Sequence, residues 1–180
     1  MKKFALGLIT FCVFFICSCN NTNDTSKENT DSTSVSANTL NENDTIVIGH
    51  VSGDTITFTA DSNTLRTDWQ NFLNNQPEIG TCTLNDIQFF VNSGTYYLTV
   101  RGNTETDMLR STMELQKSPI GCLYICGYKI TCTTTDCSSE VMGCMPLNTA
   151  CTECQNKGKC TKSSSNSVTI FPSIAPSTCY

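Results

Sequence analysis

The chain has 180 residues, of which 15% are charged and 13 are cysteines, and its net charge is −5 at pH 7. This length accommodates one domain with additional segments. An acidic chain without a basic stripe binds nucleic acid poorly, so we expect no nucleic-acid partner. Anionic lipid headgroups would not attract such a chain either.

The first 18 residues have the layout of a signal peptide. Lys2 and Lys3 precede an apolar run from Phe4 to Ile16. This run is shorter than the about 20 apolar residues of a transmembrane helix, and its charged start and short apolar middle are typical of a secretory leader. Cleavage after residue 18 removes two lysines and no acid, which leaves 9 basic and 16 acidic residues and a net charge of −7.

The leader ends with the sequence Ile16-Cys17-Ser18-Cys19. It resembles the lipobox of bacterial lipoproteins, in which an aliphatic residue at −3 and a small residue at −1 precede an obligatory cysteine. The resemblance implies lipidation of Cys19 and a membrane partner through the anchor, because two or three acyl chains hold a protein stably. The residue after Cys19 is Asn20 and not Asp, which favours the outer membrane over the inner membrane. It does not distinguish the periplasmic face of that membrane from the cell surface. The alternative is a secreted protein with a fortuitous cysteine.

Residues 19–44 are predicted to be a lipidated, disordered tether. Val35, Ala37 and Leu40 are the only apolar residues among 20–44. Such a segment buries too little surface to offset its ordering entropy. As a flexible coil it would span about 25–30 Å.

Residues 45–133 are predicted to form a small α+β domain. β-Branched residues favour a strand over 45–51, and polar–apolar alternation favours another over 55–60, with a turn between them. Asp61 or Ser62 caps a predicted helix that ends near Asn74. The apolar residues of this helix share one face: Leu65, Trp69, Phe72 and Leu73.

The rest of this range predicts a mainly antiparallel sheet with the helix on one face. Turn signals separate the expected strands, which cover residues 84–91, 95–101, 107–115 and 123–133. A loop-rich, cysteine-rich disulfide module is expected over 134–180. Within it we expect a loop at 163–167 and a last strand at 168–171.

Cysteines are concentrated between Cys122 and Cys160, with 8 in 39 residues. So few large apolar groups surround them that the region needs cross-links. In an exported protein such cross-links are disulfides. Because the mature chain has ten cysteines besides Cys19, all of them can pair without leaving a free thiol. The connectivity stays open among the ten candidates: Cys82, Cys122, Cys126, Cys132, Cys137, Cys144, Cys151, Cys154, Cys160 and Cys179.

A metal-binding or electron-transfer module is the alternative reading of these cysteines. Cys151 and Cys154 form one C-x2-C pair, but a four-cysteine zinc site usually takes two such pairs, and no histidine lies nearby. The tandem spacing of iron–sulfur proteins is absent. A redox role for the pair would require a thioredoxin-like βαβ context, which the chain lacks. We therefore predict no metal and no cofactor.

The spacing from Cys132 to Cys160 is similar to that in the cysteine-rich tails of small, uncharacterised lipoproteins from Gram-negative bacteria. The resemblance covers about 40 residues. It implies a location at the cell envelope and carries no activity.

No catalytic set is evident. His50 is the only histidine, and Ser52 and Asp44 lie near it in the sequence. However, the chain lacks a G-x-S-x-G elbow, an H-E-x-x-H motif and a phosphate-binding loop. We expect a non-catalytic, lipid-anchored envelope protein that binds a protein or glycan partner or has a structural role at the cell surface. A small hydrolase or thiol enzyme is a third hypothesis, and its best candidate is His50.

Overall fold

A computed structural model of the chain describes residues 45–177. The predicted leader, Cys19, the tether and Cys179 lie outside the described residues. The strands are β1 (Thr45–Ser52), β2 (Thr55–Phe58), β3 (Thr83–Asn92), β4 (Thr95–Asn103), β5 (Met108–Lys117), β6 (Cys122–Cys126), β7 (Tyr128–Thr134), β8 (Pro146–Leu147), β9 (Ala150–Cys151) and β10 (Thr161–Asn166). The helices are α1 (Ser62–Asn74) and α2 (Ser167–Ile170).

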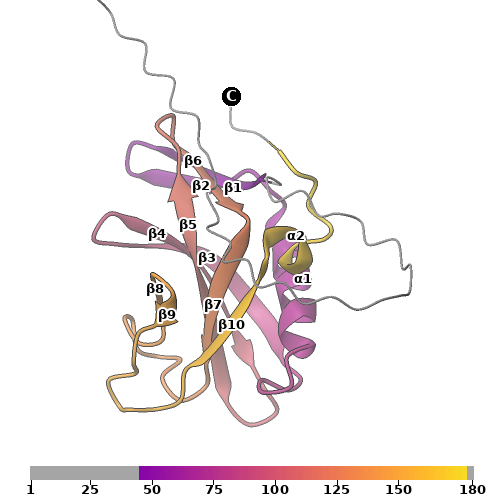
Figure 1. The fold of residues 1–180 in the computed structure, drawn as a ribbon, viewed down its shortest axis with the longest axis vertical. Coiled ribbons are helices and arrows are strands. Elements are labelled where there is room, and N and C mark those ends of the chain that lie inside the picture. Colours follow the sequence, from indigo (N-terminus) through magenta and orange to yellow (C-terminus); the bar gives the residue numbers. More distant parts are fainter. Residues whose placement is uncertain (1–44, 178–180) are drawn as a thin grey trace, which may run out of the picture. The chain divides into compact units, whose positions relative to one another are not determined.

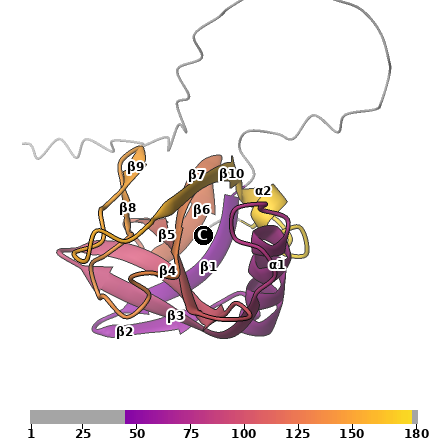
Figure 2. The ribbon, with the colours of Figure 1, turned by 90° about the horizontal axis from the view of Figure 1, so that it is seen from below.

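All strand pairs in the described residues are antiparallel, which confirms the expected sheet class. The order is β10-β7-β5-β6-β1-β2, with β4 on the free edge of β5 and β3 beyond β4. The sheet is strongly curved, and α1 lies on its open side (Figures 1 and 2). β8 and β9 form a separate small hairpin.

The chain turns a corner at Gly127, where the sequence predicted one continuous strand over 123–133. Gly127 has φ +60°, a conformation that glycine adopts without steric cost. Before the corner, β6 pairs with β1 and with the end of β5; after it, β7 pairs with the start of β5 and with β10. Gly127 therefore divides the predicted strand between two parts of the sheet.

Helix α1 confirms the predicted helix and its buried face. Its N-cap is Asp61, whose carboxylate accepts a hydrogen bond from the Thr64 N–H at 2.7 Å, and this bond lowers the pKa of Asp61. Leu65, Trp69 and Leu73 are completely buried. The ring of Trp69 meets that of Phe171 edge-on, with centroids 5.9 Å apart. Trp69 is thus a core residue, as its helical spacing predicts.

Two predictions near the C-terminus are wrong. The expected loop at 163–167 belongs mostly to β10, which pairs with β7 from Thr161 opposite Thr133 to Asn166 opposite Tyr128. The expected strand at 168–171 is instead the short helix α2, capped by the Asn166 side chain. The serine-rich segment is extended because the edge of β7 supplies its hydrogen-bond partners. Segments on both sides of the expected boundary at residue 134 therefore share one sheet.

The C-terminal segment is fastened to α1 by a buried carboxylate. Asp68 accepts hydrogen bonds from the N–H and the hydroxyl of Ser173, both at 2.9 Å. Since the two residues are far apart in sequence, these bonds hold the segment after α2 against the helix. The arrangement places Phe171 against Trp69 in the core.

Candidate functional site

Three disulfides cross-link residues 132–160, which we call the cysteine module. They join Cys132 to Cys151, Cys137 to Cys154 and Cys144 to Cys160. All three bridges start before any of them ends in the sequence, so each bridge is interleaved with the other two. The predicted disulfide bonding is therefore confirmed for these six cysteines, and the structure selects one pairing that the spacing left open.

The interior of the module consists mainly of sulfur. Cys132, Cys137, Cys144 and Cys154 are buried, and Ile130, Cys151 and Cys160 pack against them at the periphery. Each of the bridges from Cys132 and Cys144 thus has one buried and one partly exposed end, while the bridge from Cys137 is buried at both ends.

Two acidic residues organise the loops between the bridges. The carboxylate of Glu140 accepts hydrogen bonds from the backbone N–H groups of Gln155 and Asn156, at 2.8 and 3.1 Å. The carboxylate of Asp136 accepts one from the Lys159 N–H at 2.7 Å. These bonds satisfy backbone donors in a region with little regular structure. Both carboxylates therefore have a structural role.

Arg110 joins the module to the sheet. It lies on β5, is 3% exposed, and donates hydrogen bonds to the carbonyl oxygens of Glu140 and Gly143. Burial lowers the pKa of Arg110, as does the neighbouring Arg101, whereas Glu140 raises it. No sequence pattern distinguished Arg110 from a surface arginine on an alternating strand, because its partners are carbonyl groups 30 or more residues away.

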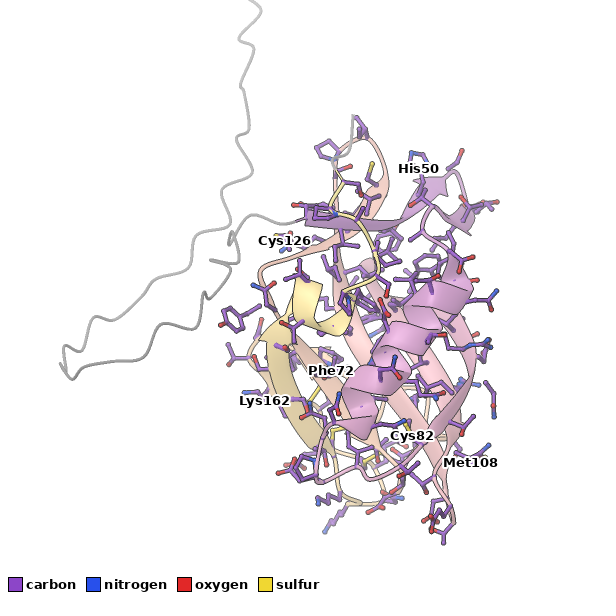
Figure 3. The ribbon with its side chains drawn as sticks, turned by 90° about the vertical axis from the view of Figure 1, so that its right-hand side faces the viewer. His50, Phe72, Cys82, Met108, Cys126 and Lys162 are labelled. Carbon is purple, nitrogen blue, oxygen red and sulfur yellow. A yellow bond between two sulfur atoms is a disulfide. The ribbon has the colours of Figure 1, made fainter. Side chains whose placement is uncertain are left out.

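A cleft of about 540 Å³ opens beside the module. Its wall contains Cys151 and Cys160, which belong to different bridges, together with the charged residues Glu153, Lys157 and Lys162. Lys162 lies on β10, where Figure 3 labels it. The cleft is therefore lined by one cysteine from each of two disulfides, together with two lysines.

The sulfur atoms of Cys132, Cys151 and Cys160 all lie within 4.8 Å of one another. Thiolates at this spacing could converge on a soft metal ion. In this structure, however, Cys132 is bonded to Cys151 and Cys160 to Cys144, and a disulfide sulfur carries no thiolate charge. Metal binding here would require reduction of both bridges.

The other predicted cysteines differ in their state. Cys122 and Cys126, on β6, are disulfide-bonded. Cys82 is buried and free, and burial raises the pKa of its thiol. Cys82 packs in the apolar core near the end of α1, and its N–H donates to the Asn74 side chain at 2.7 Å (Figure 3). Cys151 and Cys154 do not form the redox pair that their spacing would allow, because each is bonded elsewhere.

His50 lies on β1, away from the β8–β9 hairpin (Figures 1 and 3). Its Nε2 atom is 3.0 Å from the carbonyl oxygen of Ile120. Because a carbonyl oxygen only accepts, Nε2 carries the proton and donates this bond. Among the described residues, the structure gives His50 no hydrogen bond to a nucleophile.

A second cleft, of about 360 Å³, lies at the end of the sheet formed by the β4–β5 turn, the end of β7 and the segment after α1. Threonines dominate its wall, and Glu78, Glu105, Asp107 and Lys159 supply its charges. It contains no cysteine or histidine.

No protein-family model, curated protein or solved structure shows significant similarity to the chain. None of the helices formed by the described residues is long and apolar enough to cross a membrane.

Proposed function

We propose that this chain is a lipid-anchored protein of the bacterial cell envelope, held in the outer membrane through Cys19, which acts by binding a protein or glycan partner and not by catalysis. The anchor is inferred from the lipobox-like end of the leader. The folded domain would be carried on the tether of residues 20–44.

The observation that carries this proposal is the set of three interleaved disulfides between Cys132 and Cys160. Reduced thiols prevail in the cytosol, whereas structural disulfides persist in exported proteins. A module whose interior is sulfur depends on its bridges for stability, so it supports an oxidising destination. This agrees with the predicted leader.

Lipidation is tested by replacing each of two neighbouring cysteines in the full chain. Cys19→Ser should abolish incorporation of a labelled fatty acid and release the protein from the membrane fraction. Cys17→Ser is the matched control and should retain both, because the resemblance to a lipobox rests on Ile16, Ser18 and Cys19 and not on Cys17. Incorporation that survives Cys19→Ser would contradict the anchor, and the mass of the mature N-terminus would then locate the true cleavage site.

Exposed apolar side chains support partner binding at the module. Of the seven large apolar residues exposed in the described part of the chain, three lie within 141–147: Val141, Met142 and Leu147. Apolar groups kept in contact with water often mark an interaction site. A photo-crosslinking residue at position 147 should give one discrete adduct in intact cells, whereas the same residue at the exposed Met108 should give none. Equal adducts at both positions would contradict a site at the module.

The alternative function, a metal-binding or electron-transfer module, rests on the group formed by Cys132, Cys151 and Cys160. It predicts free thiols in the protein as isolated, together with stoichiometric metal. Our proposal predicts that these three cysteines resist alkylation under denaturing conditions until a reductant is added. Thiol titration with metal analysis separates the two.

A further inference from the structure

We propose that the cleft beside the module is a site of thiol–disulfide exchange, where a dithiol reduces the Cys144–Cys160 bridge and Cys160 then exchanges with the Cys132–Cys151 bridge. The inference does not depend on the lipid anchor or on the partner. It rests on the position of three sulfur atoms that belong to two different disulfides.

The geometry brings a sulfur of one bridge against the other bridge. The sulfur of Cys160 lies within 4.8 Å of the sulfurs of both Cys132 and Cys151. Exchange requires a thiolate to reach a disulfide sulfur and form a mixed disulfide. Only a small displacement is needed once Cys160 is released from Cys144. The Cys137–Cys154 bridge is outside this group and is buried at both ends.

The cleft gives an external dithiol access to the correct ends of the two bridges. Cys151 and Cys160 line it, whereas their partners Cys132 and Cys144 are completely buried. An incoming thiolate that attacks Cys160 expels Cys144 as the leaving group. Cys151, the other cysteine that lines the cleft, then lies within reach of the released Cys160 thiolate.

Two lysines line the cleft together with Cys160. Lys157 and Lys162 line the same wall, with Glu153 as the only acidic side chain there. A neighbouring ammonium group stabilises a thiolate and increases the fraction that reacts. Asp136 and Glu140, the other acids of the module, are engaged by backbone N–H groups in the loops.

The exchange conserves atoms and electrons. One thiolate of the dithiol attacks Cys160 and expels the Cys144 thiolate; the second thiol of the dithiol then closes its own disulfide and expels Cys160. The Cys160 thiolate attacks Cys151, a Cys151–Cys160 bond forms, and the Cys132–Cys151 bond breaks. Cys132 and Cys144 take up the two protons. The dithiol has lost two electrons, and the module has one bridge fewer.

Burial of the two product thiols slows the return reaction. Its two product thiols, Cys132 and Cys144, are the completely buried members of their pairs. An apolar environment favours the neutral thiol, which is a poor nucleophile. Reverse attack by either buried thiol is therefore slow. The new bridge would join the two cysteines that line the cleft.

A matched pair of variants tests the exchange in the full chain. Cys144→Ser and Cys160→Ser remove the same bridge but leave different thiols. After acid quenching, alkylation in denaturant and peptide mapping, label on Cys132 should be about tenfold higher in Cys144→Ser than in Cys160→Ser. Cys82, which is free in both, serves as the internal reference. Label that stays on Cys160 in Cys144→Ser, with Cys132–Cys151 intact, would overturn the proposal.

A measurement on the unaltered chain keeps the test valid if a variant does not fold. Less than one equivalent of dithiothreitol, followed by acid quenching and mapping, should place label on Cys132 and Cys144 and reveal a Cys151–Cys160 peptide. Label confined to Cys144 and Cys160 would show reduction without exchange. Label appearing first on Cys137 and Cys154 would show that the cleft is not the point of entry. Either result would overturn the inference.

Discussion

The curved sheet and the cysteine module differ in what fills their interiors. Every large side chain that is fully buried in the described residues lies outside the module, in the sheet, α1 or the segment at α2. The buried cluster of the module consists of four cysteines with Ile130 at its edge, and Met145 is its buried large apolar side chain. The sheet is therefore stabilised by removing apolar surface from water, and the module by covalent limits on its unfolded chain. Changes to one region should leave the other largely intact.

The largest expected effect comes from removing all three bridges of the module. Each closes a loop of 16 to 19 residues and should contribute roughly 2–4 kcal/mol. With all six cysteines replaced by serine, amide hydrogens of 136–160 should exchange at nearly the unfolded rate. Those of β3, β4 and β5 should keep their protection. A global loss of protection would show that the sheet depends on the module.

Trp69→Ala should have the next largest effect, because it opens a cavity in the apolar core. We expect a loss of about 3–5 kcal/mol in the free energy of unfolding. The indole N–H of Trp69 has no hydrogen-bond partner among the described residues, so Trp69→Phe, which keeps a ring near Phe171, should cost much less. Circular dichroism in guanidinium chloride measures both variants. Equal losses would mean that ring volume does not determine the stability of the core.

Arg110→Met should loosen the connection between the two regions. It removes the donors to the carbonyl oxygens of Glu140 and Gly143, at a cost of about 3 kcal/mol. Arg101→Met is the control, since Arg101 faces Arg110 across the β4–β5 pair but is exposed, and its loss should be nearly neutral. Hydrogen exchange should rise at 140–143 in the first variant alone. Matching results from the two would contradict a connecting role for Arg110.

Asp68→Ala should have the smallest effect of the four. It removes the buried acceptor of two hydrogen bonds from Ser173. Because Ser173 is itself exposed and its donors can bond to water instead, we expect a loss of about 1–2 kcal/mol. Asp68→Asn keeps one acceptor oxygen and should recover part of the stability. Limited proteolysis should cut after residue 171 faster in Asp68→Ala. Unchanged proteolysis would contradict the role of these bonds.

Local patterns predicted the elements whose interactions are close in sequence. The hairpin of β1 and β2, the cap at Asp61 and the buried face of α1 follow from residue type and spacing over a few positions. The high local density of cysteines likewise predicted cross-links. Too few apolar residues lie between these cysteines to form a hydrophobic core. The antiparallel class of the sheet followed from the short turns between its strands.

Tertiary contacts decided the rest. The serines of β10 are extended because β7 offers an open edge, and the segment after them becomes helical where Asn166 can cap it. Gly127 divides one apolar run into two strands because the run meets different partners on either side of the corner. The pairing of the cysteines, and the proximity of Cys160 to a bridge that is not its own, accompany loops that are held by Arg110, Asp136 and Glu140. Such contacts join residues far apart in the chain, and no periodicity in the sequence encodes them.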